Sequence, residues 1–81
     1  MDLFDSHKTA MELRKKYPRG TELVLDVMHE PFHPVANGMH GKVDHIDDAG
    51  QIHMKWDNGR SLPLVPGLDE FHVAAEGEVR G

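Results

Sequence analysis

Residues 41–66, GKVDHIDDAGQIHMKWDNGRSLPLVP, decide the fold of this chain. In the middle of the stretch, apolar and polar residues alternate along QIHMKW, residues 51–56. An alternation with period two is typical of a strand that has one face in a core and the other in water. The pattern therefore predicts a half-buried strand that carries Ile52, Met54 and Trp56 on its inner face.

Glycine turns flank this strand on both sides. Asn58-Gly59 provides two residues that tolerate positive φ, which predicts a two-residue type I′ hairpin turn. Asp48-Ala49-Gly50 closes a slightly longer hairpin with glycine in the left-handed position, so that residues 42–47 pair with residues 51–56. The meander continues through Leu62 and Leu64. Pro63 between them donates no hydrogen bond, which favours an edge strand.

A helix is predicted before the sheet, over residues 7–16, with Asp5 or Ser6 as its cap. Ala10, Leu13 and Tyr17 recur at the spacing of one apolar stripe. We interpret this stripe as a lid packed over one open end of a β-barrel. The alternative is a basic amphipathic helix that binds a membrane surface or a partner, and the small apolar face argues against it.

Two further strands complete the predicted fold, over residues 21–28 and 71–73. Five short strands, a long first loop and two tight hairpins are typical of a five-stranded SH3-like barrel, here mainly β and preceded by one α-helix. The predicted organisation is a capping helix at 1–20, a barrel at 21–73 and a flexible tail at 74–81. The expected core comprises Leu23, Leu25, Val27, Val43, Ile46, Ile52, Met54, Trp56, Leu62, Leu64, Phe71 and Val73, with Leu13 and Tyr17 covering one end.

Length and composition limit the classes of protein. Eighty-one residues form a single small domain, and the absence of cysteine excludes a disulfide framework and a thiolate zinc site. The chain has no apolar run of membrane-spanning length and no signal-peptide pattern at its start, so we expect a soluble, cytoplasmic protein. The net charge of −5 argues against non-specific binding of nucleic acid by the whole surface.

Three segments carry a resemblance to a known family: LRKKYPRGTELVL, GKVDHIDDAGQIHMKWDNG and LPLVPGLDEFHV. They resemble a family of small bacterial and phage proteins catalogued as a domain of unknown function, over residues 11–73. The resemblance implies an SH3-like barrel and a phage or mobile-element context. It implies no activity, so it assigns no catalytic residue.

The loop at residues 29–40, HEPFHPVANGMH, is the candidate site for function because it is long and rich in Pro and Gly. A loop of this length cannot bury all its apolar residues against so small a core. We therefore expect at least one exposed apolar residue, Phe32 in the first place, at the centre of a protein-binding site, with histidines as its polar rim. The predicted partner-binding residues are Met28, Phe32, His33, Val35, Met39 and His40.

Other functions stay open at this point. The basic helix end, Arg14, Lys15, Lys16 and Arg19, favours contacts to the phosphates of a nucleic acid. An acidic barrel surface would suit an inhibitor that mimics nucleic acid. His29, His33 and His40 are candidate metal ligands, although their spacing is weak evidence and we expect no cofactor. No nucleophile motif or phosphate-binding loop occurs, so we expect a non-enzymatic protein that is a monomer or weak homodimer with a protein partner.

The predicted core position of Trp56 can be tested by substitution. Trp56→Ala is expected to lower the free energy of unfolding by about 3 to 5 kcal/mol, because the large side chain leaves a cavity. Urea denaturation followed by circular dichroism measures this change. An unaltered unfolding midpoint would place Trp56 on the surface.

Overall fold

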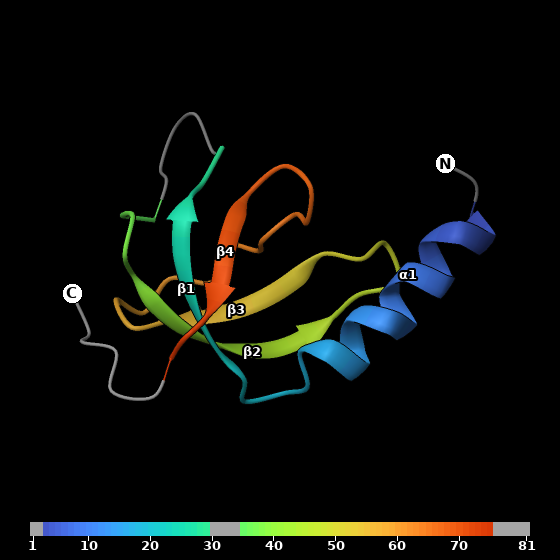
Figure 1. The fold of residues 1–81 in the computed structure, drawn as a ribbon, viewed down its shortest axis with the longest axis horizontal. Coiled ribbons are helices and arrows are strands. Elements are labelled where there is room, and N and C mark those ends of the chain that lie inside the picture. Colours follow the sequence, from blue (N-terminus) through green and yellow to red (C-terminus); the bar gives the residue numbers. More distant parts are fainter. Residues whose placement is uncertain (1–2, 30–34, 76–81) are drawn as a thin grey trace.

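The computed structural model describes residues 3–29 and 35–75, with side chains of the first helix described from Lys8 onward. The chain forms one helix and four strands (Figure 1). Among the described residues, no helix combines the length and apolar character that crossing a membrane requires. The elements are α1 (Leu3–Lys16), β1 (Glu22–Val27), β2 (His40–Ile46), β3 (Ile52–Trp56) and β4 (Glu70–Val73).

The four strands make one antiparallel sheet in the order β3-β2-β1-β4. The prediction of a mainly β protein with one helix is confirmed. The expected five-stranded closed barrel is not: the sheet remains open, and residues 60–64 add an isolated bridge between Leu64 and Ile52 and a hydrogen bond from the Trp56 amide to the Arg60 carbonyl. Ile52 and Leu64 exchange both backbone hydrogen bonds, so the nitrogen of Pro63 faces away from β3 and its missing hydrogen removes no bond to this strand.

Both hairpins around β3 use the same three-residue turn. In the first, the Gly50 amide donates to the Asp47 carbonyl and Gly50 has φ +85°. In the second, the Gly59 amide donates to the Trp56 carbonyl and Gly59 has φ +87°. Asn58 does not have positive φ, so the predicted two-residue type I′ turn is wrong. Each turn instead matches the three-residue hairpin in which a left-handed glycine follows a type I turn.

Helix α1 packs against the β2–β3 turn (Figure 1). It begins at Leu3, so Asp5 and Ser6 lie inside it and do not cap a helix that starts at residue 7. Ala10 is fully buried, and Leu13 approaches Gly50 so closely that a Cβ added to this glycine would lie 3.7 Å from Leu13 Cδ1. The apolar side of α1 therefore faces the protein, as the predicted lid required.

Most of the predicted core residues are buried, with two corrections. Val27 and Val73 are 37% and 51% exposed. The register of β1 against β4 shifts between Leu25 and Val27, which turns Val27 outward, and Val73 ends the edge strand β4. Val24 and Val35 are buried as well, although the expected core did not include Val24 and Val35 was predicted to bind a partner.

Trp56 is 3% exposed and lies directly opposite Gly41 on β2. A Cβ at Gly41 would lie 2.6 Å from Trp56 Cε3, so the indole occupies the space that a side chain there would fill. Trp56 Nε1 also donates a hydrogen bond of 2.8 Å to the Leu62 carbonyl. The tryptophan thus joins β2, β3 and the segment after β3.

The contact between Gly41 and Trp56 predicts that Gly41→Ala destabilises the protein by about 1 to 3 kcal/mol through overpacking. Chemical denaturation of Gly41→Ala, Trp56→Leu and the double variant gives the coupling energy between the two sites. We expect Gly41→Ala to cost less when residue 56 is leucine, because the clashing ring atom is gone. Equal costs in both backgrounds would contradict the proposed clash.

Candidate partner-binding site

A hollow of about 170 Å³ lies beside the end of β1 and the segment that leads to β4. Its walls are mainly apolar, and Leu68 at its edge is 54% exposed. Large exposed apolar side chains beside a concave surface are typical of interaction sites. The hollow is lined by Met28, His29, Gln51, Leu62, Pro63, Val65, Leu68 and Asp69.

The Asp69 carboxylate holds the walls of the hollow together. Asp69 is buried, and its Oδ1 accepts a hydrogen bond of 2.8 Å from the His29 amide. Its Oδ2 accepts a hydrogen bond of 2.9 Å from the Val65 amide. One side chain therefore connects the end of β1 to residues 65–69, and the turn through Gly67, φ +89°, leaves Leu68 at the surface.

The predicted binding residues are divided among the hollow, the core and positions outside the described residues. Met28 lines the hollow, and its sulfur accepts a hydrogen bond of 3.4 Å from the Val35 amide. Val35 is buried in the core and Met39 packs against it. Phe32 and His33 lie outside the described residues. Of the predicted residues that the structure describes, only Met28 reaches the hollow.

The second half of the predicted loop is held against β1 by backbone hydrogen bonds. The Leu25 amide donates to the Met39 carbonyl at 3.0 Å, and the Gly38 amide donates to the Leu25 carbonyl at 2.6 Å. Residues 35–39 therefore have a structural role.

Four residues that line the hollow were not predicted from the sequence: Leu62, Pro63, Val65 and Leu68. Pro66-Gly67 is a turn signal, and it indicates that Leu68, which follows it, lies on a turn.

The candidate metal ligands are not brought together. His40 is buried, and its Nδ1 is hydrogen-bonded to Glu22 at 3.0 Å, whereas His29 is exposed at the edge of the hollow. His33 lies outside the described residues. Across residues 3–29 and 35–75, no three His, Cys, Asp or Glu side chains are arranged to hold a metal ion.

The residues of the basic helix end have two different roles: Arg14 makes structural contacts, and the other three lie on the surface. Arg14 donates from Nε and Nη2 to the Ile46 carbonyl, at 3.0 and 2.7 Å, and from Nη2 to Asp48 at 3.0 Å. It thereby ties α1 to the end of β2. Lys15, Lys16 and Arg19 are exposed, and the Lys16 ammonium lies 5.3 Å from the centre of the Tyr17 ring.

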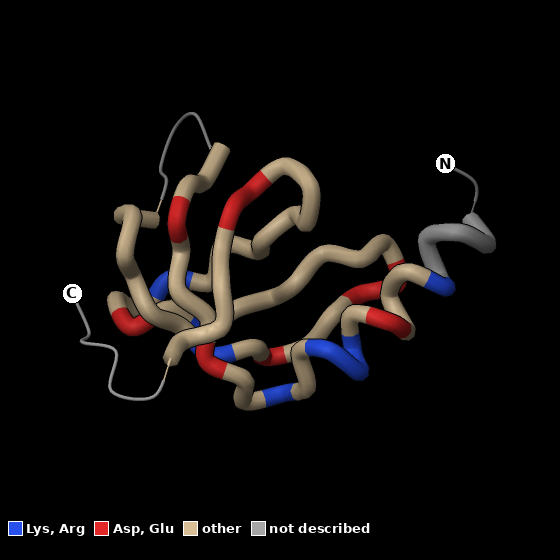
Figure 2. The backbone as a smooth tube through the Cα atoms, viewed as in Figure 1, with Lys and Arg blue, Asp and Glu red and all other residues tan. Residues whose placement is uncertain are grey.

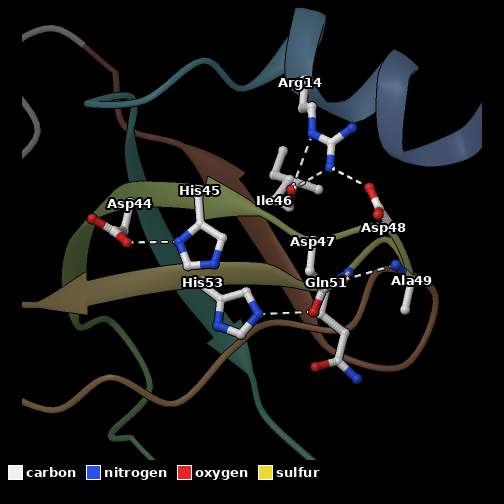
Figure 3. A network of polar contacts seen from close by, with 9 residues as sticks. All are labelled: Arg14, Asp44, His45, Ile46, Asp47, Asp48, Ala49, Gln51 and His53. Atoms are coloured by element: carbon white, nitrogen blue, oxygen red, sulfur yellow. Dashed lines mark hydrogen bonds and ion pairs between the residues drawn. The ribbon is translucent and has the colours of Figure 1, made fainter. Parts of the chain in front are cut away.

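A network of carboxylates and imidazoles lies on the outer face of β2 and β3 (Figure 3). His45 and His53 are direct cross-strand partners, and their rings stack with centroids 4.3 Å apart and an angle of 7°. Each ring binds one carboxylate: His45 Nδ1 lies 2.7 Å from Asp44, and His53 Nε2 lies 2.8 Å from Asp47. The hydrogen bond from His45 is the main reason that the pKa of Asp44 lies below its ordinary value.

Asp47 organises the β2–β3 turn. Its Oδ1 accepts hydrogen bonds from the amides of Ala49 and Gln51, at 3.0 and 2.9 Å, and its Oδ2 is bound to His53. Burial alone would raise the pKa of Asp47, but the hydrogen bonds from His53, Gln51 and Ala49 outweigh it and lower this pKa. The turn is therefore more stable with the carboxylate ionised.

The chain is similar to one known protein family. A family model described as "Domain of unknown function (DUF4314)" matches residues 6–74. No curated protein and no solved structure matches the chain.

The lowered pKa of Asp47 predicts a pH-dependent effect of Asp47→Asn. The stabilisation from the ionised carboxylate is complete above the ordinary aspartate pKa and is lost as the pH falls through the lower pKa of the folded protein. We expect Asp47→Asn to cost about 1 kcal/mol near neutral pH and much less once Asp47 is protonated in both states. Urea denaturation as a function of pH measures this, and a cost that does not change with pH would show that the charge is unimportant.

Proposed function

The chain belongs to the DUF4314 family of domains of unknown function, and we propose that it is a non-catalytic module that binds a protein segment in the hollow beside Leu68. The exposed apolar side chain of Leu68, at the edge of an apolar hollow, carries this proposal. Truncating such an anchor in a binding site typically removes much of the affinity.

The size of the hollow favours a protein segment over a small-molecule ligand. Its volume of about 170 Å³ is below the roughly 300 to 1,000 Å³ that is common for ligand pockets. It suits one large apolar side chain of a partner, placed among Met28, Leu62 and Leu68. We expect the surrounding partner residues to lie across the outer surface of residues 62–69.

Prolines and hydrogen bonds restrain the walls of the hollow, which reduces the cost of binding. Pro63 and Pro66 restrict the backbone of one wall, and Asp69 fixes that wall to the end of β1 through two hydrogen bonds. Gln51 is half-buried in the lining, and its side-chain amide makes no hydrogen bond to another described residue. This amide would orient a partner's backbone by donating or accepting a hydrogen bond.

The fold relation, the cellular setting and the oligomeric state of the chain are part of this proposal. We propose that the fold is related to SH3-like barrels, because the bridge between Leu64 and Ile52 lies where a fifth strand would pair with β3. We place the module in the cytoplasm, in a phage or mobile-element context, as a monomer or weak homodimer. The resemblance of the three sequence segments supports the mobile-element context, and the lack of cysteine supports the cytoplasmic location.

Selection from a displayed library of random peptides tests the proposal, since it needs no identified partner. We expect the selected peptides to share one large apolar residue and to shift the amide resonances of Met28, Gln51 and Leu68 in ¹⁵N-labelled protein. Leu68→Gln is expected to weaken binding at least tenfold, about 1.4 kcal/mol, because the anchor is removed.

Met11→Gln is the matched control, because Met11 is exposed to a similar extent, 48%, and lies on α1 outside the lining of the hollow. It is expected to bind like the unmodified protein. Both substitutions replace surface side chains, so both variants should retain their unfolding midpoints. Peptides that bind Leu68→Gln with unchanged affinity, or a library that yields no binder, would refute the hollow as the docking site.

A further inference from the structure

Basic side chains face each other on two rungs of the β2–β3 ribbon. Lys42 is the direct cross-strand partner of Lys55, and His45 is the direct partner of His53. All four side chains lie on the outer face, because Val43, Ile46 and Met54 point into the core. Like charges directly opposite each other disfavour a sheet, and Asp44, 3.6 Å from Lys55 Nζ, offsets part of this repulsion.

Further cations join this face from α1 and the turn after it. Arg19 Nη2 and Lys55 Nζ lie 3.9 and 3.6 Å from the same oxygen of Asp44, which therefore stands between them. Figure 2 shows the blue segments at the end of α1 and in the following turn beside β2. We define the basic face as Arg14, Lys15, Lys16, Arg19, Lys42, His45, His53 and Lys55, which includes six of the nine lysines and arginines of the chain.

A groove and an aromatic platform accompany these charges. The groove has a volume of about 310 Å³ and runs between the end of α1 and β2, lined by Tyr17, Arg19 and His45 among others. The His45 side chain is 59% exposed, so the ring face turned away from His53 is open to solvent. Unpaired bases stack on histidine and other aromatic rings.

The face carries a small excess of lysines and arginines over carboxylates. Five carboxylates accompany its six lysines and arginines: Glu12 on α1, Glu22 on β1, and Asp44, Asp47 and Asp48 on and beside β2. The excess of these groups is therefore +1. Asp44 and Asp47 count as ionised near neutral pH, because the pKa of each is held below its ordinary value.

We propose that the basic face binds single-stranded nucleic acid, with phosphates at Arg19, Lys42 and Lys55 and a base stacked on His45. The combination of separate cations with an exposed ring is the arrangement that sequence-independent single-strand binding uses. Affinity falls as the salt concentration rises, because the lysine and arginine contacts to phosphates release counterions from the strand.

The same observations disfavour two other polyanions. An anionic membrane would be bound by an apolar helix face together with basic residues, but Ala10 is fully buried and Leu13 packs against the core. None of the large apolar residues that are exposed among the described side chains belongs to the basic face. Duplex DNA has no unpaired base to stack on His45. The ligand class is therefore a flexible single strand, and the site is separate from the hollow beside Leu68.

Fluorescence anisotropy with a labelled oligodeoxythymidine of about 16 nucleotides tests the proposal, in a salt series near neutral pH. We expect binding that weakens as the salt concentration rises, because phosphate contacts release counterions. Lys42→Gln with Lys55→Gln is expected to lower the slope of log affinity against log salt by about 1.4, since each single-strand phosphate contact contributes about 0.7. The same double variant is expected to melt at the same temperature as the unmodified protein or higher, because the lysine repulsion is removed.

Three further variants separate this site from a general charge effect. Asp44→Asn is expected to bind several times more tightly, because it releases Arg19 and Lys55 from their shared carboxylate. Lys8→Gln with Arg60→Gln removes two cations outside the basic face and serves as the control, and Leu68→Gln should bind the oligonucleotide unchanged. The proposal would be overturned if the control pair lost as much affinity as the Lys42 and Lys55 variant, or if that variant bound as tightly as the unmodified protein. A preference for duplex DNA or anionic vesicles, or the lack of any binding at low salt, would also overturn it.

Discussion

The packing of the Trp56 indole over Gly41 is the constraint on which the rest of the structure depends. Because Gly41 has no side chain, β2 can pair with β3 while the large indole ring covers the position of Gly41. Any other residue at position 41 would bring a Cβ into the ring. The indole nitrogen then holds the Leu62 carbonyl, which fixes the segment after β3 without a regular strand. Since Leu62 and Pro63 line the hollow, one tryptophan connects the core to the candidate site.

Two aspartates, one buried and one half-buried, accept hydrogen bonds from backbone amides that have no partner in the sheet. Asp47 accepts backbone amides in the β2–β3 turn, and Asp69 does the same across the end of β1 and residues 65–69. In both cases a carboxylate satisfies amides that no strand partner reaches, at places where the chain changes direction. The hollow beside Leu68 and the histidine pair on β2 and β3 are each built on one of these aspartates.

The two candidate surfaces differ in the physics of binding. The hollow is apolar, small and framed by prolines, so binding there would depend on burial of a side chain and vary little with salt. The basic face is exposed and would contact phosphates through lysine and arginine side chains, so binding there would vary with salt. The two candidate surfaces share no lining residue, because Leu68 and the rest of the hollow lie outside the groove of the basic face.

The sequence by itself determined the helix, the four strands, both turn positions and most of the core, because period-two alternation and turn glycines act over a few neighbouring residues. It could not show that Asn58-Gly59 closes a three-residue turn, that Val27 turns outward at a register shift, or that residues 60–64 stop short of a strand. The sequence pattern predicted Met28 as a binding residue but placed the other residues of the candidate site in the loop at 29–40. Only the tertiary structure decided that Val35 and His40 are buried, that Leu68 borders a hollow and that Lys42 faces Lys55, because these relations join segments far apart in the chain.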